Sequence, residues 1–182
     1  MNKILLQKKD LTFLKKAIDN KETREALRGV IMTEAGDMAT TDGRRLHILN
    51  GKGFSAGPEG ITPGAYTILG ETKSGPAGYM EIILEKMELE APDVAKVIPD
   101  TSNGLGMISI YDKKEDKTSL TRAIINLYNR TGRGYQHEYL EALAPFNTPW
   151  KLYAKGTGND VGPALLVFGD LKAVMMPMAR ID

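Results

Sequence analysis

The sequence predicts an α+β protein in which short helices lie on one side of antiparallel sheets. Each half of the chain, about residues 1–95 and 101–182, runs from a short amphipathic helix into three strands joined by turns. The turns carry strong signals, such as Asp42-Gly43 and Gly169-Asp170, because glycine accepts positive φ freely. Apolar residues make up 42% of the 182 residues and charged residues 26%, which is typical of a folded globular chain. We therefore expect residues 1–182 to form a single domain with a pseudo-twofold repeat.

The first half begins with a strand and a helix. Lys3–Gln7 has a strand pattern, and Asp10 is placed to cap a helix whose apolar residues Leu11, Leu14, Ala17 and Ile18 share one face. Glycine and proline make the segment 50–64 a loop. The remaining strands of this half are expected at Ala26–Thr33, Met38–Thr41, Leu46–Leu49, Tyr66–Leu69 and Tyr79–Leu84.

A segment bracketed by proline, residues 91–100, joins the halves and holds a single helical turn at most. The second half is expected to contain a short helix over Tyr139–Ala144 that ends at Pro145. A turn is expected over Gly156–Gly162. The strands of this half are expected at Met107–Tyr111, Ser119–Tyr128, Trp150–Ala154, Ala164–Phe168 and Leu171–Met178.

Charge and composition exclude several classes of protein. The net charge of +1 provides no field that favours DNA over the whole molecule, so any nucleic-acid contact must be local. The basic residues Lys15, Lys16, Lys21 and Arg24 form either an ordinary solvated face or a phosphate-facing stripe. The absence of cysteine excludes a disulfide framework and a thiolate metal site. The apolar run near the N-terminus is too short for a signal peptide, so we expect a cytoplasmic protein.

The sequence contains no recognisable catalytic constellation. The two histidines, His47 and His137, stand in unrelated settings, and each fits a packed or a surface residue better than a ligand. Glycine-rich segments at 131–135 and 155–160 lack the spacing of a phosphate loop and fit turns better. The loop carboxylates Asp37 and Asp42 have no evident catalytic partner. We therefore expect no enzyme activity, no metal and no cofactor.

Four segments resemble the bacterial sliding clamp, the beta subunit of DNA polymerase III, and they occur in the order found in that family. ALRGVIMTEAGDMATTDGRRLHIL (26–49) is similar to the strand–turn–strand passage of the middle clamp domain. APDVAKVIP (91–99) resembles the segment that joins the middle and last domains. EYLEALAPF (138–146) resembles a helix of the last domain, and VMMPM (174–178) its closing strand.

The resemblance implies a DNA-clamp fold in a reduced form. The family subunit has three tandem domains, whereas this sequence matches the start of one domain and the end of another, with the parts between them shortened. The helix HEYLEAL is acidic, unlike the basic helices that line the channel of a clamp, which weighs against encirclement of DNA.

The resemblance also implies a cleft that receives short peptide motifs from replication partners. Leu46, Val97, Val174, Met176 and Met178 would form its apolar wall, since methionine adapts to varied side chains. Gly43 would let a peptide backbone approach, and a basic rim would steer acidic groups. The residues carried over from the family motifs are Thr41, Gly43, Arg44, Arg45, Leu46, Pro92, Lys96, Val97, Val174, Met175, Met176, Pro177 and Met178.

The function that this implies is a non-catalytic, clamp-like module of DNA replication or repair. Its partners would be proteins that carry clamp-binding motifs, such as a DNA polymerase or a clamp loader, and any DNA binding would be weak. Two alternatives stay open: a ring of several copies that encircles DNA as a processivity factor, and an enzyme of unrecognised type on a similar scaffold.

Overall fold

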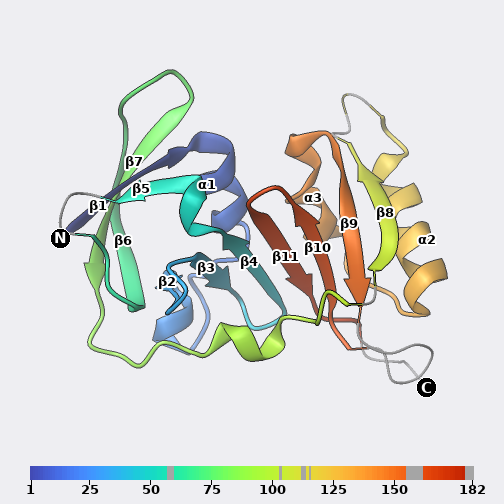
Figure 1. Cartoon of the computed structure of the whole chain (residues 1–182), viewed down its shortest axis with the longest axis horizontal. Coiled ribbons are helices and arrows are strands. Elements are labelled where there is room, and N and C mark those ends of the chain that lie inside the picture. The colour runs from blue at the N-terminus through green and yellow to red at the C-terminus, as the bar shows by residue number, and fades with distance from the viewer. Residues whose placement is uncertain (57–59, 103, 112–113, 115, 155–161, 179–182) are drawn as a thin grey trace. The chain divides into compact units, whose positions relative to one another are not determined.

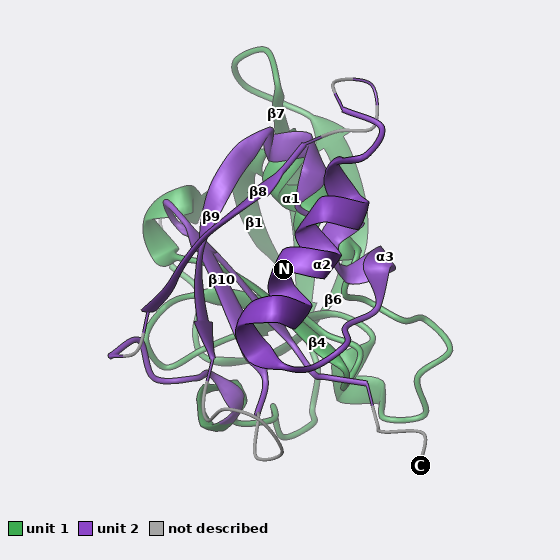
Figure 2. Cartoon of the chain, turned by 90° about the vertical axis from the view of Figure 1, so that its right-hand side faces the viewer, with its two compact units in different colours: residues 1–96 green, residues 97–182 purple. Residues whose placement is uncertain are grey.

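Antiparallel strands and short helices make up the chain, as expected for an α+β fold (Figure 1). The computed structural model describes all residues except 57–59, 103, 112–113, 115, 155–161 and 179–182. The chain divides into two compact units, Met1–Lys96 and Val97–Asp182, close to the expected junction of the halves (Figure 2). That the two units fold together as one domain stays a prediction.

Unit 1 is a sheet of seven strands in the order β5-β1-β7-β6-β2-β3-β4, and all of its neighbouring strands are antiparallel. Short one-turn helices stand at Glu25–Leu27 and Gly51–Gly53. Its main elements are β1 (Asn2–Gln7), α1 (Lys8–Lys15), β2 (Val30–Met32), β3 (Met38–Thr41), β4 (Arg45–Leu49), β5 (Phe54–Ala56), β6 (Gly64–Lys73) and β7 (Tyr79–Lys86).

Helix α1 is fixed to the sheet of unit 1 by buried side chains and by two polar contacts. Leu11, Phe13 and Leu14 are almost completely buried. The Thr40 hydroxyl of β3 donates to the Leu14 carbonyl at 2.6 Å, and Nδ1 of His47 on β4 lies 2.6 Å from the Phe13 carbonyl oxygen. Both carbonyls lie at the helix end, where they also accept the Lys16 and Ala17 N–H groups at 3.2 and 3.0 Å.

Two expectations about α1 are wrong. The helix begins at Lys8, so Asp10 lies in its first turn instead of capping it, where a carboxylate still suits the helix dipole. The helix ends at Lys15, so Ala17 and Ile18 lie beyond it. Ala17 is nevertheless fully buried, because the chain after the helix still packs on the core.

Unit 2 is a sheet of four antiparallel strands in the order β11-β10-β9-β8. The only tryptophan, Trp150, is completely buried and packs against Phe146 and Phe168, with ring centroids 5.7 and 5.6 Å away. The elements are β8 (Gly104–Ile110), α2 (Ser119–Thr131), α3 (His137–Glu141), β9 (Thr148–Ala154), β10 (Ala164–Phe168) and β11 (Leu171–Met175).

The segment expected as a strand at Ser119–Tyr128 is the helix α2. Leu120, Ala123 and Leu127 repeat at helical spacing and are buried, and Gly132 ends the helix with φ of 70°. Helix α2 also bonds to β8, the last strand of this sheet. The Arg130 guanidinium donates to the Leu105 carbonyl, and the Ser119 hydroxyl accepts the Tyr111 N–H at 2.8 Å.

Other differences from the expected elements are local. The segment expected as loop at 50–64 contains β5, and the strand expected at Ala26–Thr33 is only Val30–Met32, preceded by the one-turn helix Glu25–Leu27. A one-turn helix at Val94–Val97 confirms the single turn expected there. The turn expected over Gly156–Gly162 falls largely outside the described residues. No helix in the described part of the chain is long and apolar enough to span a membrane.

Candidate functional site

The Thr41–Leu46 hairpin is held by its own polar groups. The Thr41 hydroxyl donates to the Arg45 carbonyl at 2.6 Å and accepts from the Gly43 N–H at 3.0 Å. Asp42 Oδ1 accepts the N–H groups of Arg44 and Arg45, each at 3.0 Å, and Oδ2 lies 2.9 Å from Arg45 Nε. Asp42 is therefore occupied in shaping the turn through the bonds to its following backbone that the hairpin signal predicted, and its pair with Arg45 adds to them.

Gly43 has the positive φ, 81°, that the hairpin signal predicted. Its open face is not vacant, however, because the Arg24 guanidinium lies against the position that a Cβ would take. Arg24 is itself paired with Glu22, at 3.0 Å. Arg24 must therefore move before a peptide backbone can approach Gly43.

Leu46 differs from its expected place on the rim of a pocket. The residue is only 2% exposed and belongs to the core. Arg45 beside it is half-buried through its pair with Asp42, whereas Arg44 is exposed. Of the hairpin residues, Arg44 is therefore the one whose charge is most available to a partner.

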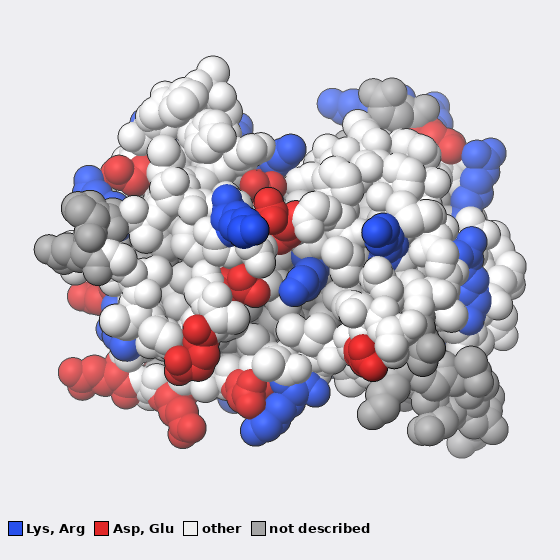
Figure 3. Space-filling model, in the orientation of Figure 1, with Lys and Arg blue, Asp and Glu red and all other residues white. Residues whose placement is uncertain are grey.

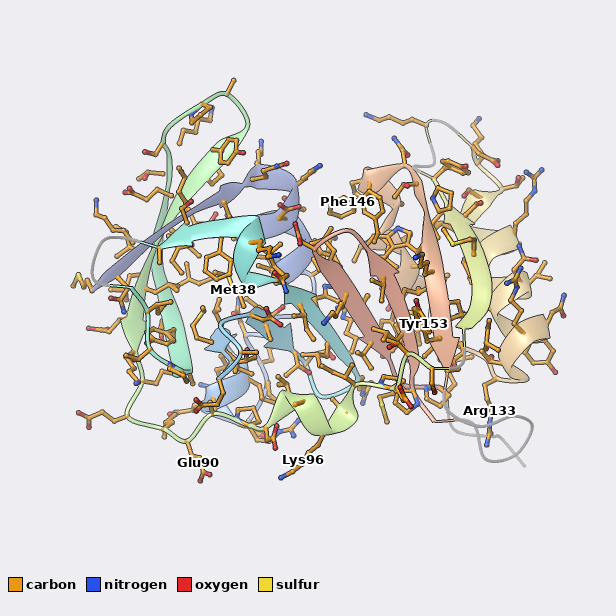
Figure 4. All side chains as sticks on the ribbon, in the orientation of Figure 1. Met38, Glu90, Lys96, Arg133, Phe146 and Tyr153 are labelled. Carbon is orange, nitrogen blue, oxygen red and sulfur yellow. The ribbon has the colours of Figure 1, made fainter. Side chains whose placement is uncertain are left out.

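The segment after β7 places Pro92 half-buried and Lys96 in solvent. Lys96 pairs with Asp93 at 3.2 Å, and Figure 4 shows Glu90 and Lys96 pointing away from unit 1. Val97, the first residue of unit 2, is 44% exposed. Val97 is therefore one of the proposed cleft residues that the structure leaves open.

The closing strand β11 ends at Met175, short of the expected Met178. Pro177 has no backbone N–H to donate to a neighbouring strand, and its ring restricts the backbone conformation of Met176 before it. Val174 and Met175 are buried, whereas Met176 and Met178 are 41% and 48% exposed. The Met178 N–H donates to the Gly134 carbonyl at 2.9 Å, which fixes this segment beside the end of α2.

The structure thus divides the proposed cleft residues by exposure. Val97, Met176 and Met178 are among the large apolar side chains that the described part of unit 2 leaves most open, whereas Val174 and Met175 of unit 2 and Leu46 of unit 1 are buried. Thr41–Leu46, Pro92 and Lys96 belong to unit 1, and Val97 and Val174–Met178 belong to unit 2. That both groups line one cleft stays a prediction.

His47 is buried and His137 is exposed, as expected of a packed and a surface histidine. The ring of His47 stacks on Phe13, with centroids 4.1 Å apart, and burial lowers the pKa of His47 to about 4. Nε2 of His47 is buried and has no hydrogen-bond partner among the described residues. No group of His, Asp and Glu in those residues could hold a metal ion.

Of the four basic residues expected to face DNA, two are held in ion pairs with acidic residues and two are exposed. Lys15 pairs with Glu71 at 2.6 Å and Arg24 with Glu22, which leaves Lys16 and Lys21 as exposed cations. Helix α2, which sequence reasoning missed, has no acidic residue and carries Arg122 and Arg130, but Arg122 pairs with Asp116 at 3.0 Å and Arg130 donates to the Leu105 carbonyl. Figure 3 shows Lys and Arg side chains along α2, while charges of both signs are interspersed over unit 1.

No protein-family model and no curated protein matches the chain. Solved structures of bacterial sliding clamps do match it. A clamp from Pseudomonas aeruginosa with a ligand is 16% identical with a TM-score of 0.55, and the match covers 99% of this chain and 66% of the clamp. The polymerase III beta subunit of Caulobacter crescentus is 16% identical with a TM-score of 0.55, and the match covers 98% of this chain and 66% of that subunit. The Helicobacter pylori beta clamp bound to a DNA ligase peptide is 13% identical with a TM-score of 0.51, and the match covers 98% of this chain and 66% of that clamp.

The similarity runs through both units and is far stronger in structure than in sequence. It spans about 66% of the length of a clamp chain. The antiparallel strands and short helices of this chain therefore follow the fold of solved sliding-clamp structures. The chain has the fold of the bacterial DNA polymerase sliding clamps.

Proposed function

We propose that this chain is a non-catalytic, clamp-like module of DNA replication or repair that binds short peptide motifs of replication proteins. The partners would be proteins such as a DNA polymerase or a clamp loader, in the cytoplasm. The sliding-clamp fold supports this role, as does the Helicobacter pylori clamp, which was solved with a DNA ligase peptide.

The observation that carries the proposal is the exposure of three apolar side chains. Val97, Met176 and Met178 are 44%, 41% and 48% exposed, although apolar residues of this size are usually buried. Two of the three are methionines, whose flexible thioethers adapt to different apolar anchors. An apolar peptide side chain that covers them would remove this surface from water, at roughly 25 cal/mol per Å².

The polar residues of the proposed cleft have supporting roles. Arg44 and Lys96 are exposed and would attract acidic groups near the peptide anchor. Arg45 is already paired with Asp42, so it holds the hairpin in shape. We expect Arg44→Ala to slow association and Arg45→Ala to act mainly through the turn.

A titration of the full chain with a short peptide of Leu-x-Phe type, followed by calorimetry, tests the proposal. We expect a dissociation constant of roughly micromolar size, because a flexible peptide loses ordering entropy against a small interface. Met176→Glu should weaken binding at least about tenfold, since a carboxylate would be buried without a partner.

Met107→Glu is the matched control for this experiment. Met107 is 46% exposed and also belongs to unit 2, but it lies on β8 and is not a proposed cleft residue. Binding by wild type that falls equally in both variants, or no binding at about 1 mM peptide, would exclude the proposed site. Leu46→Ala is not a useful probe, because it would make a cavity in the core.

A second candidate function is contact with DNA, alone or as a ring of several copies. The observation that favours it is that α2 carries Arg122 and Arg130 and no acidic residue, although Arg122 pairs with Asp116 and Arg130 also bonds to the Leu105 carbonyl. Few cations are involved, so the affinity would be low and would fall with salt. Lys15, Lys16, Lys21 and Arg24 add little to these charges, because Lys15 and Arg24 are held in ion pairs.

A further inference from the structure

A groove runs beside helix α1 on unit 1, and none of the proposed cleft residues lines it. It consists of two adjoining pockets of about 690 and 340 Å³. Both pockets are lined by Lys15 and Glu71, whose Nζ and Oε1 atoms are 2.6 Å apart. We call these two pockets together the α1 groove.

Apolar side chains form much of the lining of the α1 groove. Two of them, Met80 and Met87, are methionines, and Leu89, which lines the larger pocket, is 44% exposed. Exposed apolar surface of this kind marks an interaction site, and methionine lets such a site accept different side chains. The apolar lining residues are Leu11, Ile18, Ile68, Met80, Met87 and Leu89.

The charges of the groove favour an acidic occupant. Lys8 and Lys16 on the α1 side are exposed and form no ion pair within the described residues, and they stand about 12 Å apart along the helix direction. Of the acids in the lining, Glu71 pairs with Lys15, Glu25 lies 3.9 Å from Arg28, and Glu88, next to Leu89 in the larger pocket, is exposed. The positive charge available to an occupant therefore lies in the smaller pocket, at Lys8 and Lys16.

The lining also sets the size and the kind of occupant. Met80 lies on β7 and Met87 follows its last residue, Lys86, so the two methionines are seven residues apart, which corresponds to at most about 23 Å of extended chain. A peptide of six or seven extended residues would fill that length.

Nucleic acid is the other class of occupant that a basic surface could bind. It contacts such a surface mainly through its phosphates, which gain nothing from an apolar lining, so a peptide fits this groove better.

We propose that the α1 groove is a docking site for an extended acidic segment of a partner protein, with apolar side chains between its carboxylates. The apolar side chains contact Met80, Met87 and Leu89, and the carboxylates contact Lys8 and Lys16. The Lys15–Glu71 pair is partly exposed, so a carboxylate of the partner can replace Glu71 at little cost. The proposal does not depend on the cleft at Met176.

The probe is a fluorescein-labelled peptide, Glu-Leu-Glu-Leu-Glu-Leu-Glu, whose binding to the full chain is followed by anisotropy. The variant Leu89→Glu should weaken binding about tenfold, because it places a like charge on the apolar lining. Leu69→Glu is the matched control: Leu69 is 47% exposed, also on unit 1, and does not line the groove. The double variant Lys8→Glu, Lys16→Glu should weaken the acidic probe and improve binding of the same peptide with lysine in place of glutamate.

Amide shifts identify the surface that the probe uses. We expect them along α1 and β7, with no more than small changes at Met176 and Met178. Equal binding of the acidic and the lysine peptide, equal loss in the Leu69 and Leu89 variants, or shifts centred on Met176 would overturn the proposal. Stronger binding of a single-stranded oligonucleotide that Leu89→Glu leaves unchanged would assign the groove to nucleic acid and overturn it as well.

Discussion

Mild acid should destabilise this protein through one buried side chain, His47. Nδ1 of His47 donates to the Phe13 carbonyl, so the neutral ring carries its free lone pair on Nε2, which is buried without a partner. A second proton on Nε2 would be a buried charge with no acceptor. Burial therefore lowers the pKa of His47 from 6.5 to about 4, with the nearby Arg45 acting in the same direction.

The sign and size of the effect follow from this pKa. The unfolded chain binds a proton at His47 near pH 6.5 and the folded chain only near pH 4, so stability is complete above 6.5 and is lost as the pH falls toward 4. At about 1.4 kcal/mol per unit, the full loss is about 3 kcal/mol, and about 2 kcal/mol of it is gone by pH 5. The carboxylates with lowered pKa, Glu22, Asp100 and Asp116, titrate below this window.

Urea unfolding followed by circular dichroism at pH 7, 6 and 5 measures the loss. His47→Gln is the comparison, because the amide can still donate to the Phe13 carbonyl but does not titrate. This variant should be less stable than wild type at pH 7, since it loses the stacking on Phe13, yet its stability should be almost level between pH 7 and 5. An equal slope in both proteins would refute the assignment, because His137 is common to both.

Three further predictions concern the chain as a whole. If the two units fold as one domain, the fluorescence of Trp150 in unit 2 should report the same urea midpoint as circular dichroism; a fragment of residues 1–95 that melts cooperatively by itself would contradict this. Arg130→Ala frees the Leu105 carbonyl on the last strand of unit 2, so sedimentation should show more self-association than wild type, and an unchanged mass would argue against edge protection. Binding to linear duplex DNA should be weak and lost with added salt; tight binding at physiological salt would contradict the small number of available cations.

Local chemistry made the hairpin at Thr41–Leu46 predictable. Asp42 and Gly43 determine its turn through side-chain bonds and positive φ, and neither depends on distant residues. Helix α2 was missed although Leu120, Ala123 and Leu127 repeat at helical spacing, because the β-branched and aromatic residues among them favour strands. Gly132 after this segment was the signal that could have corrected the assignment.

The site was less predictable than the fold, because exposure depends on packing between segments that are far apart in sequence. Leu46 and Met176 are both apolar members of family-like motifs, yet Leu46 is 2% and Met176 is 41% exposed. Pro177 explains why the strand stops before Met176, but no sequence pattern states what covers Leu46. The position of Arg24 against Gly43 likewise comes from the fold and not from either motif.

The difference in exposure between Leu46 and Met176 indicates which side chains of this protein can contribute to binding. The most distinctive polar motif, Thr41–Leu46, uses its donors and acceptors to hold its own turn, so it has few left for a ligand. Among the apolar side chains that remain open are Val97, Met176 and Met178 on unit 2 and Leu89 in the α1 groove of unit 1. Recognition by such surfaces depends on an apolar anchor and only secondarily on rim charge. Substitutions to glutamate at these exposed positions should therefore weaken binding about tenfold or more while the fold survives, whereas loss of a rim arginine should mainly change the rate of association.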